Sequence, residues 1–163
     1  MSNTVPNRVS VQTGSRLHFG MFSFGNSDVR QFGGVGAMVS QPGISILITP
    51  AQRLVVTGLL AARAQQIIER TLPMIQQELA TRDESVSQYP SIHVLHAPRQ
   101  HTGLGVGTQL SLALVAGLRQ FYGLPTLSAR QLAEYAGRAE RSAIGTYGFL
   151  QGGLLVEAGK KEV

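Results

Sequence analysis

The sequence has no cysteine and no tryptophan, and its two lysines stand together near the C-terminus, at Lys160 and Lys161. Without cysteine there is no disulfide framework, no thiolate zinc site and no cysteine nucleophile. Hydrophobic residues make up 43% of the chain, yet no apolar run reaches the roughly 20 residues that span a bilayer. The N-terminal segment also lacks the basic stub and apolar stretch of a signal peptide. We therefore expect a globular, cytoplasmic protein with no membrane partner.

Charge is also scarce, because charged residues make up only 14% of the chain. Twelve of the 14 basic residues are arginines, and the net charge is +5. Guanidinium groups form paired hydrogen bonds with carboxylates and phosphates, so this excess favours anionic partners. A nucleic-acid site needs a basic stripe with aromatic platforms, whereas here the arginines are scattered and aromatics make up 6%. The composition favours a small anionic, phosphorylated substrate over nucleic acid.

The length of 163 residues suits one domain, over 1–163. Apolar and alternating runs predict strands, and the turn signal Gln41-Pro42-Gly43 predicts that the second and third form a β-hairpin. The predicted strands cover 9–13, 33–39, 44–49, 53–57, 91–97 and 154–156. We find no internal repeat.

Apolar residues at helical spacing predict three helices. The first covers 61–80, with a kink or break near Thr71 and Leu72 because Pro73 lacks an amide hydrogen. The second runs from Leu110 to a cap at Gly123, and the third starts at Ser128 and ends around 137.

Three glycines within five residues, Gly103, Gly105 and Gly107, stand between a predicted strand and the second helix. Such a loop lets the backbone approach a ligand closely, while the helix presents unpaired amides and the positive end of its dipole. That combination binds phosphate, although glycine-rich turns are often only turns. No Gly-Lys-Ser/Thr ends the loop, and no acidic residue follows in a strand about 20 residues later. The loop is thus neither a Walker loop nor a dinucleotide fingerprint.

The order of elements and the segment GLGVGTQLSLAL at 103–114 resemble the GHMP superfamily of small-molecule kinases, whose second motif is a Gly-Leu-Gly-Ser-Ser-Ala loop. Within it, the chain is similar to the β-ribofuranosylaminobenzene 5'-phosphate synthase (β-RFAP synthase) family over most of its length, 9–160. The segments that carry this similarity are SRLHFGMFSFG at 15–25, RQFGGVGAMVSQPG at 30–43 and RSAIGTYGFLQGGLLVEAGK at 141–160. The resemblance implies an α+β fold like the GHMP N-terminal domain: a mostly antiparallel sheet, helices on one side, and a glycine-rich loop before a long helix.

The resemblance also implies a transferase that condenses phosphoribosyl pyrophosphate with 4-aminobenzoate, releasing pyrophosphate and carbon dioxide, in methanopterin-type cofactor biosynthesis. An ATP-dependent kinase is the first alternative, but kinases of this superfamily often carry an aspartate base in the segment aligned with 142–153. This chain has none there, since its aspartates are Asp28 and Asp83. A non-catalytic fragment or assembly module is the second alternative. Family members carry a C-terminal domain that we expect to be absent here, so we expect little activity from this chain alone, and either self-association or a missing C-terminal half as its partner.

We predict roles for particular residues from this resemblance. The anion cradle is Gly103, Leu104, Gly105, Gly107 and Thr108. Arg141, Ser142 and Thr146 hold the ribose phosphate or pyrophosphate, and Arg16 and His18 meet the aryl carboxylate, so that the predicted catalytic set is Arg16, His18 and Arg141.

Two of these role assignments have structural alternatives. An ion pair of Arg141 with Glu134 or Glu140, and a structural role for His18, are the competing interpretations. We expect His93 to be structural and His96 and His101 to flank the loop, within reach of a ligand. The glycines at 33, 34 and 36 are expected to permit close packing or a bulge. No metal ligands are predicted, because Val106 replaces the family's Ser and carboxylates are few. Mg²⁺ accompanying phosphoribosyl pyrophosphate or ATP is the one cofactor to consider.

Overall fold

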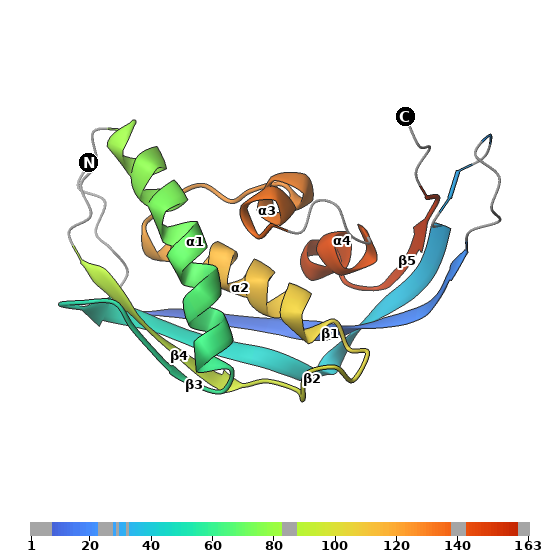
Figure 1. The fold of residues 1–163 in the computed structure, drawn as a ribbon, viewed down its shortest axis with the longest axis horizontal. Coiled ribbons are helices and arrows are strands. Elements are labelled where there is room, and N and C mark those ends of the chain that lie inside the picture. The colour runs from blue at the N-terminus through green and yellow to red at the C-terminus, as the bar shows by residue number, and fades with distance from the viewer. Residues whose placement is uncertain are drawn as a thin grey trace.

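The computed structural model describes residues 8–22, 28, 30, 31, 33–82, 88–137 and 143–159. Its helices lie on one face of a five-stranded sheet (Figure 1). The strands are β1 (Val9–Phe22), β2 (Gly33–Ala51), β3 (Val55–Gly58), β4 (Tyr89–His96) and β5 (Leu154–Glu157). The helices are α1 (Ala61–Ala80), α2 (Val106–Phe121), α3 (Ala129–Tyr135) and α4 (Ala143–Gln151).

The strand order is β1-β2-β4-β3, and β5 also pairs with β2. β2 pairs antiparallel with β1, β4 and β5, while β3 pairs parallel with β4. Helix α2 packs on the sheet between α1 and α4, and α3 lies farther from the sheet against α2 and α4 (Figure 1). The predicted α+β fold, mostly antiparallel with helices on one side, is confirmed.

The predicted β-hairpin over 33–49 is wrong, because β2 is one continuous strand of 19 residues. Both halves of β2 pair with β1, from Phe22 opposite Gly33 to Val9 opposite Ile48. The Pro42-Gly43 signal lies in the extra residues of β2 at a register shift, where Thr13 pairs with Ile44 and Ser15 with Val39, and the Ser15 hydroxyl donates a hydrogen bond to the Pro42 carbonyl. A proline without an amide hydrogen and a glycine without Cβ are accommodated at such a bulge. The turn signal therefore marks a bulge instead of a chain reversal.

The register shift falls between Thr13 and Ser15 and changes which residues of β1 face the helices. Before it, Val9 is buried and Val11 packs against the core. After it, the even-numbered Arg16 lies against the loop and α4, whereas the odd-numbered Leu17 is exposed. Strand β1 thus supplies core residues in its first half and polar residues to the helical face in its second.

The core lies between the sheet and helices α1 and α2. Its largest fully buried side chains include Ile46, Ile48, Ile68, Ile75, Ile92, Leu110, Leu114, Leu118 and Phe121. Of the kink or break predicted near Thr71 and Leu72, the break is wrong, because α1 runs unbroken through Pro73; the kink stays a prediction. Pro73 and Glu69, whose carbonyl loses its helical partner, are both exposed to solvent, so water can satisfy the lost bond.

The predicted second and third helices are confirmed as α2 and α3. Gly123 follows α2 with φ +67°. Ser128 caps α3 in a capping box with Gln131. No helix in the described part of the chain is long and apolar enough to cross a membrane.

Helix α4 was not predicted, because its sequence contains Gly145 and Gly148 and is followed by Gly152 and Gly153. A Cβ on Gly148 would lie 2.5 Å from Cγ of Met38 on β2. A Cβ on Gly36 of β2 would lie 2.8 Å from Cγ2 of Ile144 on α4. These glycines allow α4 to approach β2 closely, which confirms the close-packing role expected of Gly36.

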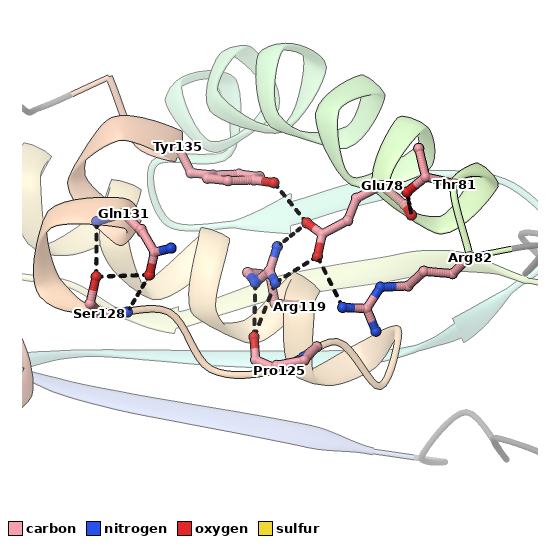
Figure 2. A network of polar contacts seen from close by, with 8 residues as sticks. All are labelled: Glu78, Thr81, Arg82, Arg119, Pro125, Ser128, Gln131 and Tyr135. Carbon is pink, nitrogen blue, oxygen red and sulfur yellow. Dashed lines mark hydrogen bonds and ion pairs between the residues drawn. The ribbon is translucent and has the colours of Figure 1, made fainter.

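A polar network joins the three helices α1, α2 and α3 (Figure 2). The carboxylate of Glu78 accepts hydrogen bonds from Arg119 at 2.6 and 3.1 Å and from the Tyr135 hydroxyl at 2.7 Å. Arg119 is only 3% exposed and also donates to the Pro125 carbonyl at 3.1 Å. The bidentate bond from Arg119 lowers the pKa of Glu78 from 4.5 to about 2. The network stabilises the helical layer away from the glycine loop.

Candidate functional site

The glycine loop forms one wall of a pocket of about 210 Å³. Loop residues 103–108 line it together with Arg63, Gln100 and His101. Arg63 comes from the first turn of α1, so two segments far apart in the sequence meet at this pocket. Within the described ranges, no carboxylate lies at ion-pair distance from Arg63. The pocket therefore brings a guanidinium to the same place as the glycine-rich backbone.

The backbone of the loop takes left-handed conformations at Gly103, with φ +79°, and at Gly105, with φ +67°. His101 is also left-handed, with φ +62°, although it is not a glycine, and such strain often accompanies functional loops. Gly105 is the N-cap of α2, and no side chain caps this helix end or adds an acidic group to its first turn. The positive end of α2 thus faces the pocket without a side-chain oxygen in front of it, which suits an anion.

Arg16 packs directly behind the loop. Its backbone amide donates a hydrogen bond of 3.0 Å to the Leu104 carbonyl. A Cβ on Gly105 would lie 3.2 Å from Cβ of Arg16 and 3.4 Å from its Nε, and a Cβ on Gly145 would lie 3.7 Å from its Nη1. The side chain of Arg16 therefore lies between the loop and the first turn of α4, and glycine at 105 and 145 gives it room.

The charge of Arg16 is only partly compensated. Burial lowers the pKa of its guanidinium, and the nearby carboxylate of Glu157 acts in the opposite direction. Its Nε is buried and makes no hydrogen bond in the structure. A buried polar atom without a partner is costly, so this position is prepared for an acceptor that a ligand can supply.

Gln109 holds the surroundings of Arg16 in place. Its side chain is 1% exposed, accepts a hydrogen bond of 2.8 Å from the Thr13 hydroxyl and donates one of 2.9 Å to the Gly145 carbonyl. Its backbone amide donates a hydrogen bond of 3.0 Å to the Gly105 carbonyl. Gln109 thereby connects β1, the loop end of α2 and the first turn of α4.

A second pocket, of about 420 Å³, lies between α4 and β5. Ile144, Tyr147 and Gln151 line it from α4, and residues 154–158 line it from β5 and the segment that follows. Glu157 stands opposite Gly34 in the β2–β5 pairing. A Cβ on Gly34 would lie 3.1 Å from Nε2 of His18, which is buried without a hydrogen-bond partner. Arg16, His18 and Glu157 therefore come from neighbouring positions on the helical face of the sheet.

The structure brings together the predicted cradle, since Gly103, Leu104, Gly105, Gly107 and Thr108 all line the loop pocket. Arg16 lies behind that pocket, and His18 lies two residues farther along β1. Thr146 is buried in α4, 5% exposed, and does not line the pocket. Arg141 and Ser142, predicted to hold phosphate, lie outside the described residues.

The other three histidines lie in different surroundings. His101 lines the loop pocket, as its position in the sequence predicts, but His96 instead lines a different pocket beside Gly14 and Gln41. His93 makes a cross-strand hydrogen bond of 2.7 Å with the Thr57 hydroxyl, consistent with the structural role expected of it. In the part of the chain that the structure describes, His, Asp and Glu side chains form no cluster of three that could hold a metal ion.

Sequence reasoning missed Arg63, Gln109 and Glu157. Arg63 and Glu157 carry charge, but their neighbours in space come from elements far away in the chain. Gln109 follows Thr108 in an otherwise apolar helix, and a polar side chain on a helix face predicted to be buried is the one signal that marks it.

Three comparisons relate this chain to known proteins. The family model described as the GHMP kinases N-terminal domain matches residues 63–153. The beta-ribofuranosylphenol 5'-phosphate synthase of Archaeoglobus fulgidus is 33% identical over 91% of this chain and 44% of its own length. The synthase of the same name from Methanothermobacter thermautotrophicus is 30% identical over 91% of this chain and 45% of its own length. The chain thus spans a little under half the length of these relatives.

Solved structures share the fold at low sequence identity. A putative sugar kinase from Campylobacter jejuni superimposes with a TM-score of 0.64 at 16% identity, over 98% of this chain and 58% of its own. A homoserine kinase from Cytophaga hutchinsonii does so with a TM-score of 0.61 at 16% identity, over 96% of this chain and 50% of its own.

Proposed function

This chain belongs to the family of GHMP kinase N-terminal domains, and from that premise we propose that it is the phosphoribosyl-binding half of a β-RFAP synthase-like enzyme. The reaction condenses phosphoribosyl pyrophosphate with a 4-substituted benzoate and releases pyrophosphate and carbon dioxide. The proposal includes the methanopterin-type pathway and cytoplasmic location expected from the sequence. Its support is the similarity to the two synthases together with the pocket lined by the glycine loop and Arg63, behind which Arg16 lies.

The single observation that carries the proposal is the anion-binding character of the loop pocket. The uncapped N-terminal end of α2 and the side chain of Arg63 both lie at this pocket, and Arg16 lies directly behind Gly105. We place the pyrophosphate of the substrate there. Arginine forks and backbone amides stabilise the negative charge that grows on the leaving pyrophosphate as its bond to ribose breaks.

The segment 143–153 favours ribosyl transfer over phosphoryl transfer to a hydroxyl. Residues 143–153 contain no carboxylate, so no aspartate base is available there to accept a hydroxyl proton. Ribosyl transfer to an aromatic carbon needs no such base, because the electrons of the breaking carbon–carboxylate bond restore the ring. Mg²⁺ enters this proposal as the counter-ion of the substrate pyrophosphate.

The names of the relatives bear on the aryl substrate. A ribofuranosylphenol product carries a hydroxyl where a ribofuranosylaminobenzene carries an amine. Our sequence-based expectation is 4-aminobenzoate. The benzoate that would give a phenol product is 4-hydroxybenzoate. It differs from 4-aminobenzoate only in the group opposite the carboxylate, and both benzoates offer a hydrogen-bond donor there.

Calorimetric titration with phosphoribosyl pyrophosphate, and separately with Mg²⁺-ATP, tests the proposal. Binding is the suitable measurement because the chain spans less than half of its relatives. We expect phosphoribosyl pyrophosphate to bind more tightly than ATP. Arg63→Gln should weaken its binding about tenfold or more, since a charge-assisted hydrogen bond is lost. Arg99→Gln, which removes the same charge from an exposed residue that does not line the pocket, serves as the control.

A second pair of variants tests the loop itself. Gly105→Ala places a methyl group against Arg16 at φ +67°, so we expect it to weaken binding. Gly152→Ala, at φ +66° with open space around it, reproduces the backbone strain without the contact. Preferential binding of ATP would favour a kinase, and binding of neither ligand would refute the proposal for this chain.

A further inference from the structure

The pocket between α4 and β5 and the side chain of Arg16 lie against neighbouring residues of α4. Ile144 lines this pocket, and the next residue, Gly145, lies against the Arg16 side chain. Gly105, on the opposite side of Arg16, lines the loop pocket. The Arg16 side chain therefore lies between Gly105, which lines the pocket of about 210 Å³, and Gly145, which follows a residue lining the pocket of about 420 Å³; Arg16 itself lines neither. The larger pocket is within the size range of small-molecule sites.

The lining of the α4–β5 pocket combines apolar walls with one carboxylate. Ile144, Tyr147 and Leu155 contribute hydrocarbon or aromatic surface, and Glu157 contributes the negative charge. The field of Glu157 acts on Arg16, so the two charges are close enough to influence each other. The helical face of the sheet here thus carries a cation beside the loop and an anion at β5.

We propose that the α4–β5 pocket is the aryl subsite and that Glu157 binds the para-amino or para-hydroxyl group of the benzoate. The inference rests on the proposed function. The ring lies between Ile144, Tyr147 and Leu155, its carboxylate points to Arg16 and His18, and its donor group points to Glu157. Such a benzoate has an acceptor at one end and a donor at the other, which matches the cation and the anion at this site.

This orientation also suits the reaction. The carbon that attacks the ribose is the one that bears the carboxylate, and it lies at the Arg16 end, nearest the pyrophosphate held in the loop pocket. As the new bond from this carbon to ribose C1 forms, the bond from C1 to pyrophosphate breaks and its electrons leave with pyrophosphate. The ring loses carbon dioxide, and the electrons of that bond restore aromaticity. Glu157 accepts a hydrogen bond from the para group and so increases electron density at the attacking carbon.

Titration of the chain with benzoate, 4-aminobenzoate and 4-hydroxybenzoate tests the subsite without the second substrate. We expect both para-substituted acids to bind about tenfold or more tightly than benzoate, because only they hydrogen-bond to the carboxylate. Glu157→Gln should reduce this preference to near unity, and Glu157→Asp should leave it intermediate. Absence of a preference in the wild-type chain would overturn the proposal whatever the variants do.

The control is Glu69→Gln, which changes the net charge equally at an exposed position on α1. We expect it to keep the wild-type preference. A Glu157→Gln protein that folds, by circular dichroism, and retains that preference would refute the assignment of Glu157.

The titrations with phosphoribosyl pyrophosphate separate the two proposals. If that ligand binds at the loop while the benzoates are not distinguished, the proposed function stands and the aryl subsite falls. If the benzoates are distinguished through Glu157 while phosphoribosyl pyrophosphate does not bind, the proposed function falls and the aryl subsite stands.

Discussion

At the scale of single residues, Gln109 connects the parts of the candidate site that the chain order keeps apart. Its side chain bonds to Thr13 on β1 and Gly145 on α4, and its backbone amide bonds to the carbonyl at the N-cap of α2. Because the bond to the Gly145 carbonyl is buried, that carbonyl cannot turn to water if Gln109 is replaced. Its contribution is to the spacing of the elements that surround Arg16.

We predict that Gln109→Met lowers the free energy of unfolding by about 2–4 kcal/mol, because two hydrogen bonds are lost and the buried Gly145 carbonyl remains unpaired. Urea unfolding at neutral pH measures this change. Ser111→Ala is the matched control, since Ser111 is fully buried on the same helix but bonds only to the Gly107 carbonyl one turn earlier. An equal effect of the two substitutions would contradict the bridging role.

The residue scale also shows where sequence reasoning stops. The loop glycines that the sequence singled out line one pocket, because their spacing in the sequence places them on one short turn before α2. The role predicted for Arg16 stays a prediction, and its contact with Gly105 and Gly145 depends on elements more than 80 positions away along the chain. The partners of Glu157 were hidden for the same reason, since a short strand alone does not state which strand it joins.

At the scale of elements, the network of Glu78, Arg119 and Tyr135 connects three helices through one carboxylate (Figure 2). Arg119 would be left almost fully buried without its counter-charge if Glu78 were neutral. Breaking one partner of such a pair is costly, which makes this carboxylate a determinant of acid stability.

We predict that Glu78→Gln lowers the free energy of unfolding at pH 7 by about 3 kcal/mol. The pKa of Glu78 is lowered from 4.5 in the unfolded chain to about 2 in the folded protein. Its stabilising contribution is therefore complete above the unfolded pKa and is lost as the pH falls through about 2. The difference in stability between wild type and variant, measured by urea unfolding, should shrink between pH 5 and 2. A difference independent of pH would contradict this role.

The elements themselves were predicted unevenly, for identifiable reasons. Helices α2 and α3 carry both an apolar stripe and end signals, and the structure confirms them. The turn signal at Pro42-Gly43 misled because a bulge and a reversal favour the same residues. Helix α4 was missed because its glycines serve contact with β2, a tertiary reason that local propensity cannot express.

At the scale of the whole molecule, β1 is an edge strand with exposed apolar side chains. Phe19 is 63% exposed and Phe22 is 53% exposed. Leu154 and Val156 of β5, which pairs with β2, are 69% and 76% exposed. Apolar surface beside an unpaired edge promotes association.

We predict that the chain self-associates, with a sedimentation coefficient that rises with protein concentration. A double variant, Phe19→Lys with Phe22→Lys, should sediment as a monomer over the same range, because lysine on an edge strand opposes pairing. The corresponding change at exposed Met74 on α1, Met74→Lys, is the control and should leave association unchanged. A wild-type chain that remains monomeric at high concentration would contradict the prediction.

The register shift near Gly14 has a consequence for how this protein can diversify. It divides one strand into a portion that packs in the core, around Val9 and Val11, and a portion that faces the candidate site, around Arg16 and His18. Substitutions in the second portion can therefore change ligand preference while the first continues to secure the sheet. A library randomised only after the bulge would sample new chemistry at little risk to folding, whereas one randomised before it would mostly yield unfolded chains.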